Sequence, residues 1–145
     1  MEIRKAIKKD FKEIGKILKQ EFARPPYKDK WTNQAATNAI KYYYKIKSDI
    51  YICVLNNKIV GFLVARYEPR DKGYLTVIEY FAIKEKFQKK GFGKKLLKRL
   101  ELDAKNKGSK VIYFNTSRNS FATKFYRKQG YSENKKIVQL GRKLK

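Results

Sequence analysis

The chain of 145 residues is 42% hydrophobic and carries a net charge of +24, and it is long enough for one domain with its own core, so we expect a single domain over residues 1–145. Since it has no histidine and only one cysteine, Cys53, an intramolecular disulfide is excluded and a zinc site has almost no ligands, so we expect no metal. No apolar run reaches the roughly 18–20 residues that span a bilayer, and the N-terminus does not have the basic-then-apolar order of a signal peptide, which predicts a cytoplasmic protein without membrane contact.

The N-terminal third is predicted to form one strand and two helices. Residues 2–7 are typical of a short strand. Asp10 is expected to cap the helix that follows, with Glu13 completing a capping box, and Pro25-Pro26 ends this helix. A second helix is expected over roughly residues 32–46, because apolar side chains recur there at helical spacing.

The middle of the chain is predicted to form three strands. Residues 50–55 and 59–67 are strand-sized apolar runs, and the Asn56-Asn57 pair between them tolerates the positive φ angles of a tight hairpin turn. Residues 68–73 are expected to be a polar connection, and residues 75–83 another strand.

The C-terminal third is predicted to alternate helices and strands. We expect helices over residues 93–107 and 119–129, a strand over residues 110–115, and a last strand or strand pair over residues 133–144. The predicted order is therefore β-α-α-β-β-β-α-β-α-β. Hairpin-linked and crossover-linked strands in one chain favour a mixed α/β fold with helices on both faces of a mixed sheet.

Residues 88–93, Gln-Lys-Lys-Gly-Phe-Gly, stand between a predicted strand and the first turn of a helix. The first N–H groups of a helix have no intrahelical partners, and glycines let a diphosphate approach them closely. Four lysines, Lys89, Lys90, Lys94 and Lys95, crowd this helix start although cations oppose the helix dipole there. An anionic ligand would resolve that conflict.

Three known glycine motifs do not fit this segment. It lacks the Gly-Lys-Ser/Thr ending of a Walker A loop, and Leu96 stands where the dinucleotide-binding fingerprint needs its third glycine. It matches the first four residues, Lys-Gly-Phe-Gly, of the RNA-recognition signature. The strand aromatics that must follow are replaced by Lys-Lys-Leu-Leu at helical spacing, so this reading fails as well.

The sequence resembles the GNAT superfamily of acetyl-CoA-dependent N-acetyltransferases over nearly its whole length. Residues 88–93 match the family's (Gln/Arg)-x-x-Gly-x-(Gly/Ala) pattern directly after a strand, and residues 119–131, with Asn first and Phe-Tyr in the middle, resemble its second signature. Lys90 stands where arginine is common, and Tyr131 where phenylalanine is usual. The resemblance implies a GNAT-like, mostly antiparallel central sheet flanked by helices on both faces, with a splayed strand pair that forms the coenzyme A cleft.

The resemblance also implies acetyl-CoA as the cosubstrate, held between the predicted strands 75–83 and 110–115. In this family the backbone of the first strand pairs with the pantetheine arm, and the N–H of Phe81 would polarise the thioester carbonyl. The positions that the resemblance assigns to acetyl-CoA binding are Phe81, Ala82, Ile83, Gln88, Lys89, Lys90, Gly91, Phe92, Gly93, Lys94, Asn119 and Tyr126.

Two residues are candidates for catalysis. Tyr126 occupies the family's tyrosine position and would donate its hydroxyl proton to the departing thiolate; packing within its helix is the alternative. Glu79 is a carboxylate within an otherwise apolar strand, which favours a general base acting through water; the alternative is that it faces solvent or pairs with a lysine. Cys53 lies in an apolar strand and is more typical of a core position than of a covalent nucleophile.

We therefore expect an N-acetyltransferase that transfers acetyl directly to a primary amine of a small molecule or a protein. Transfer of another acyl group, or a CoA-binding or nucleic-acid-binding module on the same fold, are the alternatives. The charge of +24 keeps nucleic acid possible as a partner, but the lysines are spread along the chain rather than gathered in an arm, so it is not favoured. A monomer or a homodimer is expected. The two-helix segment, which borders the acceptor side in such enzymes, contains a cluster of aromatic residues; core packing accounts for most of them, and one or two are expected to line the acceptor pocket. They are Phe22, Tyr27, Trp31, Tyr42, Tyr43 and Tyr44.

Overall fold

A computed structural model describes all 145 residues, which form two compact units, Met1–Asn115 and Thr116–Lys145. The first unit holds the sheet and three helices, and the second holds one helix. The predicted mixed α/β fold is confirmed, whereas the single domain stays a prediction. The elements are β1 (Glu2–Lys5), α1 (Phe11–Phe22), α2 (Asn33–Lys45), β2 (Asp49–Leu55), β3 (Lys58–Arg70), β4 (Gly73–Ile83), α3 (Phe92–Asn106), β5 (Ser109–Tyr113) and α4 (Phe121–Lys128).

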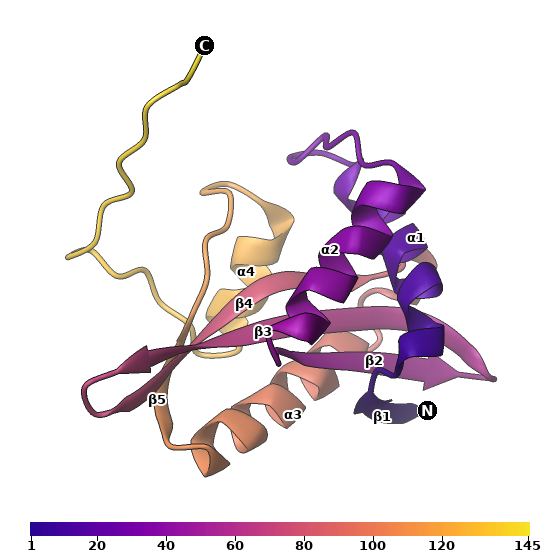
Figure 1. Ribbon diagram of the computed structural model, residues 1–145, viewed down its shortest axis with the longest axis horizontal. Helices are drawn as coiled ribbons and strands as arrows, with labels where there is room; N and C mark the ends of the chain where they lie inside the picture. Colours follow the sequence, from indigo (N-terminus) through magenta and orange to yellow (C-terminus); the bar gives the residue numbers. More distant parts are fainter. The chain divides into compact units, whose positions relative to one another are not determined.

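The sheet has the order β1-β2-β3-β4-β5, and its first four strands are antiparallel neighbours (Figure 1). The turn between β2 and β3 is tight because Asn56 and Asn57 adopt φ angles of 50° and 62°, as the sequence predicted. β5 runs parallel to β4, which requires a crossover, and α3 supplies it. The sheet is therefore mostly antiparallel, as expected.

Helices α1 and α2 cover one face of the sheet (Figure 1). Gly15 lets the two helices approach closely, because a Cβ atom there would meet Thr37 Oγ1 at 2.7 Å. α2 begins at Thr32, whose side chain accepts a hydrogen bond of 3.0 Å from the N–H of Ala35. The buried side chains of this layer include Phe11, Ile14, Ile17, Leu18, Ala36, Ile40, Ile50, Ile52, Phe62 and Val64.

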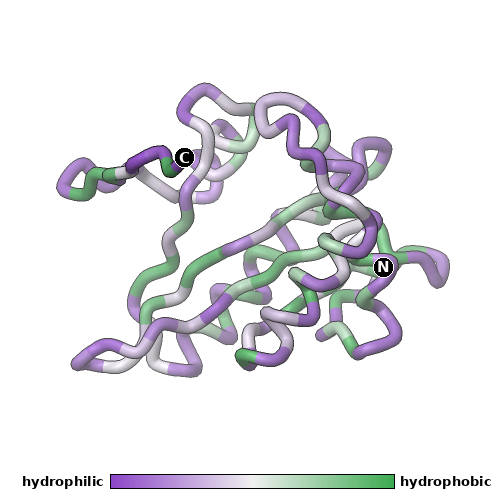
Figure 2. The backbone as a smooth tube through the Cα atoms, turned by 45° about the horizontal axis from the view of Figure 1, so that its top comes forward, coloured by the Kyte–Doolittle hydropathy of each residue, from purple (hydrophilic) through white to green (hydrophobic).

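Helix α3 covers the other face, which confirms helices on both sides of the sheet (Figure 1). Its residues Leu96, Leu97 and Leu100 are fully buried. Because side chains alternate along a strand, residues such as Cys53 and Leu63 face this layer while their neighbours face α1 and α2. Figure 2 shows the result as hydrophobic stretches along the central strands and hydrophilic turns.

The second unit contains α4 and the C-terminal segment. Ser120 caps the helix by accepting a hydrogen bond of 3.2 Å from the N–H of Thr123, so α4 begins at Phe121 and not at residue 119. After α4 the chain turns at Gly130, whose φ of 94° favours glycine. No helix anywhere in the chain is long and apolar enough to cross a membrane.

The prediction that Asp10 caps α1 through a capping box with Glu13 is wrong. Residues Lys8–Asp10 form a short 3-10 turn before the helix, and the Asp10 carboxylate points back to accept a hydrogen bond of 2.8 Å from the N–H of Ile7. Arg4 Nη1 also donates to Asp10, at 2.8 Å. Burial would raise the pKa of Asp10, but the hydrogen bond from Arg4 lowers it, so the carboxylate is charged at neutral pH. Its hydrogen bonds from Arg4 and Ile7 join β1 to the segment before α1.

Two further boundary predictions are wrong. Residues 68–70 are not a polar connection but the end of β3. The β3–β4 hairpin extends beyond the apolar residues of the two strands, and its outermost residues are polar because they face solvent. Residues 133–144 form no strand. Their apolar residues have the spacing of a strand, but a strand also needs a hydrogen-bonding neighbour, and this segment has none.

Candidate active site

Strands β4 and β5 part midway along β4. They pair at Tyr74 with Ser109 and, further on, at Val77 with Tyr113, and β4 continues through residues 78–83 without a β5 partner. Figure 1 shows β5 leaving the sheet along this stretch. The predicted splayed strand pair is therefore present.

Glu79 lies at a β-bulge in β4, where the strands begin to part. The register shifts between Val64 and Ala65, so no residue of β3 pairs with Glu79. A bulge re-aims the side chains beside it. Here Glu79 and Tyr80 both contact Tyr43 of α2, whose hydroxyl lies 3.3 Å from Glu79 Oε2 and whose ring centroid lies 5.8 Å from that of Tyr80. The bulge thus turns Glu79 toward the α2 face of the sheet.

The start of α3, immediately after residues 88–90, has no side-chain cap. Gly91 is the N-cap residue with a φ of 87°, and a Cβ atom added there would meet nothing within 4 Å. The first turn contains no acidic residue, whereas Lys89, Lys90 and Lys94 are exposed around it. Uncapped N–H groups, a positive helix dipole, nearby cations and open space fit a diphosphate.

A buried carboxylate of α1 supports this loop. The side chain of Glu21 is 6% exposed, and burial raises its pKa. Arg24 Nε lies 3.3 Å from Glu21 Oε1, while Arg24 Nη1 lies 2.7 Å from Glu85 Oε2. Gln88 Nε2 donates to the carbonyl oxygen of Ile83 at 2.8 Å and lies 3.5 Å from Glu21 Oε1. The amide of Gln88 therefore holds the loop to β4 and to α1.

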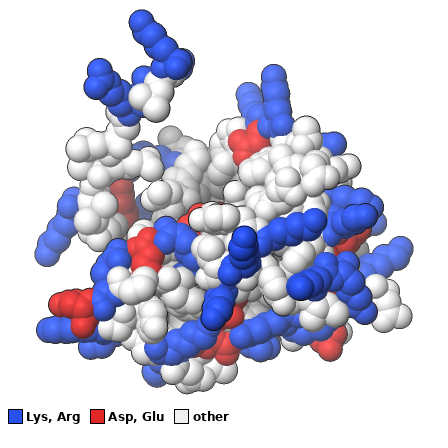
Figure 3. Space-filling model, viewed as in Figure 1, with Lys and Arg blue, Asp and Glu red and all other residues white.

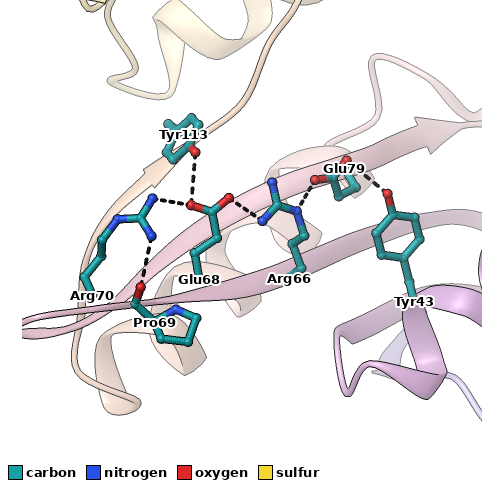
Figure 4. Close-up of polar contacts among 7 residues, drawn as sticks. All are labelled: Tyr43, Arg66, Glu68, Pro69, Arg70, Glu79 and Tyr113. Carbon is teal, nitrogen blue, oxygen red and sulfur yellow. Dashed lines mark hydrogen bonds and ion pairs between the residues drawn. The ribbon is translucent and has the colours of Figure 1, made fainter.

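Four charged side chains of β3 and β4 form an alternating row, the charged ladder, which consists of Glu79, Arg66, Glu68 and Arg70 (Figure 4). Arg66 donates from Nε to Glu79 and from Nη1 to Glu68. The hydroxyl of Tyr113 on β5 lies 3.4 Å from Glu68 Oε2. The hydrogen bond from Arg66 lowers the pKa of Glu68. Two carboxylates and two guanidinium groups leave the ladder without net charge.

An aromatic wall borders the ladder on the α2 side. Tyr80 of β4 contacts Phe22, Trp31 and Tyr43, with ring centroids 5.8, 6.1 and 5.8 Å away and near-perpendicular planes. Burial and the charge of Glu79 raise the pKa of Tyr43 to about 12, so its hydroxyl is protonated at neutral pH and donates to Glu79. Phe22, Trp31 and Tyr43 belong to the aromatic cluster noted in the sequence, whereas Tyr80 does not.

The second unit contains the remaining predicted site residues. Tyr126 lies in α4, with its ring centroid 5.4 Å from that of Phe125 and 5.9 Å from that of Tyr131. Asn119 precedes the capping Ser120 and is exposed. Both residues belong to the second unit, Thr116–Lys145.

Residues 12–131 match the sequence profile of the Acetyltransferase (GNAT) family. The chain belongs to the GNAT acetyltransferase family. It is accordingly an acyltransferase, and acetyl-CoA is the usual cosubstrate of this family. A comparison with curated proteins found no match.

Solved structures share the GNAT fold at low sequence identity. A possible acetyltransferase from Clostridium difficile 630 is 15% identical with a TM-score of 0.86, and the match covers 99% of this chain and 98% of that one. A ribosomal-protein-alanine N-acetyltransferase from Brucella melitensis biovar Abortus 2308 is 14% identical with a TM-score of 0.77, covering 98% and 99%. An aminoglycoside acetyltransferase from an uncultured soil metagenomic sample, solved with sisomicin, is 18% identical with a TM-score of 0.76, covering 99% and 96%.

The first unit of this GNAT chain brings most of the predicted positions together. Phe81, Ala82 and Ile83 are the last three residues of β4, where β5 has left it, and residues 88–94 follow them into the uncapped start of α3. Cys53 is fully buried, and burial raises the pKa of its thiol, which fits the predicted core position. A role for any of these residues in the GNAT reaction stays a prediction.

Sequence reasoning missed two charged residues of this GNAT site. Arg66 is a charged residue within an apolar strand, as Glu79 is within the next strand, and this shared feature could have suggested the ion pair. Glu21 occupies the position three residues after Leu18 and four after Ile17, on the buried stripe of its helix. A carboxylate on an apolar stripe was the available signal for it.

Proposed function

We propose that this GNAT chain is an N-acetyltransferase that moves the acetyl group of acetyl-CoA directly to a primary amine. The observation that carries the proposal is the uncapped, basic start of α3, which follows the end of β4 where β5 has parted from it. An anion cradle next to an open strand edge suits a ligand that joins a diphosphate to an amide-bearing arm. Acetyl-CoA has both parts.

The donor would be held mainly by the backbone. The N–H groups at the start of α3 would bind the diphosphate, and the charges of Lys89, Lys90 and Lys94 would add attraction. The backbone of residues 81–83 would extend the sheet by pairing with the pantetheine arm. Gln88 would act through the loop that its amide holds, and Asn119 would bind the coenzyme further along.

Acetyl-CoA supplies an activated thioester, and the chain would manage the protons. Glu79, acting through water, takes a proton from the acceptor ammonium. The freed amine nitrogen bonds to the carbonyl carbon, which the Phe81 N–H polarises, and the carbon–sulfur bond breaks. Tyr126 gives its hydroxyl proton to the departing thiolate and regains one from solvent as the new amide nitrogen loses its second proton.

The acceptor would be an amine of a small molecule or of a protein. Enzymes with this fold are named for acceptors of both kinds: one is an aminoglycoside acetyltransferase, and another is a ribosomal-protein-alanine N-acetyltransferase. The surfaces of the first unit that would receive the acceptor are the aromatic wall and the charged ladder, which has no net charge.

The test combines donor binding with turnover. We expect acetyl-CoA to bind in calorimetry and Gly91→Ala to weaken it about tenfold, since a side chain at a positive φ strains the cradle. Gly108→Ala is the matched control, because Gly108 has the same φ of 87°, equally open space and a place at the other end of α3. Release of free thiol is then followed over a panel of amines and of acyl-CoA chain lengths. Absence of acetyl-CoA binding, or equal loss in both variants, would contradict the proposal.

A further inference from the structure

A hollow lies between the start of α1 and the end of α2, away from residues 88–93. Its volume is about 710 Å³, which is in the range of small-molecule sites. It adjoins the start of β2, whereas residues 88–93 follow the end of β4 beside the far end of β2, roughly 20 Å away at strand spacing. The residues that line it are Lys8, Phe11, Lys41, Tyr44, Lys45, Lys47 and Ser48. We call it the lysine hollow.

The lysine hollow contains four cations and no carboxylate. The acidic residues nearest in sequence are already occupied: Asp10 pairs with Arg4, and Asp49 pairs with Lys5 and Lys107. None of the four lysines has an ion pair within the chain. Four like charges around one hollow repel one another, and an anionic ligand would relieve that repulsion. In Figure 3 Lys and Arg side chains outnumber acidic ones over the face on which α2 lies.

Helix electrostatics explain only part of this arrangement. Lys45 and Lys47 lie at the C-terminal end of α2, where cations favour the helix dipole. Lys8 precedes α1, where the dipole disfavours a cation. Lys47 has a φ of 62°, at a helix-ending position where glycine is usual, so a long basic side chain is kept there against the backbone preference.

An exposed aromatic ring in the lysine hollow indicates a ligand that offers more than negative charge. Tyr44 packs edge-on against Phe11, with ring centroids 5.0 Å apart, and remains 41% exposed. An exposed ring beside lysines is the combination that binds a base together with its phosphates.

We propose that the lysine hollow binds single-stranded nucleic acid. The lysines contact successive phosphates, and a base stacks on Tyr44. The overall charge of +24 draws the polyanion toward the protein. This binding is independent of the acetyl-CoA binding proposed above, because the hollow adjoins the start of β2, whereas residues 88–93 follow the end of β4 beside the far end of β2.

Salt dependence tests the lysines. We expect a fluorescent single-stranded oligonucleotide to bind in anisotropy titrations, with an affinity that falls as salt rises. The quadruple variant K8Q/K41Q/K45Q/K47Q should lose one phosphate contact for each lysine. Since each contact contributes ~0.7 to the steepness of log affinity against log salt, the slope should become shallower by about 3. The matched control K19Q/K98Q/K105Q/K110Q removes the same charge from exposed lysines elsewhere and should change the slope by less than about 1.

Stacking is tested with a pair of tyrosines on one helix. Tyr44→Leu should weaken oligonucleotide binding about tenfold, whereas Tyr42→Leu, at a ring that is exposed but outside the hollow, should not. Acetyl-CoA binding should be unchanged in both variants, which also shows that they fold. No oligonucleotide binding at low salt, equal losses in the two quadruple variants, or inorganic phosphate competing as well as oligonucleotide would overturn the proposal.

Discussion

Two strand carboxylates, Asp49 in β2 and Glu79 in β4, lie on opposite faces of the sheet and have similar partners. Each accepts a hydrogen bond from a tyrosine hydroxyl and pairs with a basic side chain. Asp49 lies at the start of β2, where Lys107 after α3 reaches it, and Glu79 lies where β4 and β5 part. Their differences separate a structural carboxylate from one that is available for chemistry.

Asp49 is enclosed by its partners. Its side chain is 7% exposed; Oδ1 lies 3.0 Å from Lys5 Nζ, and Oδ2 lies 2.9 Å from Lys107 Nζ and 2.6 Å from the Tyr67 hydroxyl. Burial would raise the pKa of Asp49, but these hydrogen bonds lower it to about 2. Three elements are thereby tied to the start of β2, and no oxygen is left for a ligand.

Glu79 has fewer partners and more solvent. Its side chain is 23% exposed, it pairs with Arg66, and the hydroxyl of Tyr43 lies 3.3 Å away. The bulge leaves its backbone outside the β3 pairing. A carboxylate that solvent reaches, where two strands part, can exchange protons with water, whereas an enclosed one only holds structure.

The largest expected effect is on stability, from Asp49→Ala. Removing this carboxylate leaves two lysines and a buried tyrosine hydroxyl without their partner, so we expect a loss of about 3 kcal/mol in the free energy of unfolding. Urea denaturation followed by circular dichroism measures it. Turnover per folded molecule should change less than about twofold; a stable variant with lost activity would reverse the assignment of roles.

The opposite result is expected for Glu79→Gln. Loss of a general base typically lowers turnover about 100-fold or more, while loss of a partly exposed ion pair costs at most about 1 kcal/mol of stability. Glu68→Gln is the matched control, because Glu68 also pairs with Arg66 but lies on β3. If both variants lose activity equally, turnover depends on the intact charged ladder, and Glu79 has no separate role as a base.

The next largest effect is the pH dependence of the stability that Asp49 contributes. Its pKa is about 2 in the fold and about 3.9 in an unfolded chain, so its contribution is complete above about pH 5 and is lost as pH falls toward 2. The stability difference between the native chain and Asp49→Asn should therefore shrink by about 2 kcal/mol between pH 5 and pH 2. A difference that stays constant with pH would show that the lysine partners do not favour the charged form.

The strand–loop–helix geometry around residues 88–93 could be predicted from sequence because it is local. Gly91 at a helix start, nearby lysines and a preceding strand are all within one short segment, and a backbone anion site needs little else. The Asn56-Asn57 turn was predictable for the same reason. The partner of Glu79 was not, because the pair with Arg66 depends on the β3–β4 register and on the bulge.

The wrong predictions also involve partners that lie elsewhere. Asp10 has the composition of a helix cap, but Arg4 and the N–H of Ile7 bind its carboxylate on the side away from α1. Residues 133–144 have strand composition, yet a strand is stabilised by a neighbour that sequence spacing does not supply. Local chemistry predicts elements and loops, whereas long-range pairing decides which polar groups are satisfied.

The smallest expected effect compares the two tyrosine hydroxyls. Tyr67 donates to Asp49 at 2.6 Å within a buried cluster, and Tyr43 donates to Glu79 at 3.3 Å beside solvent. A short bond to a buried charge is worth more than a long one that water can replace, so Tyr67→Phe should cost about 1.5 kcal/mol of stability and Tyr43→Phe less than about 0.5 kcal/mol. Thermal denaturation of both variants at pH 7 measures the difference. Equal costs would mean that solvent exposure does not distinguish the two sites, and the contrast between an enclosed and an available carboxylate would then rest on Glu79→Gln alone.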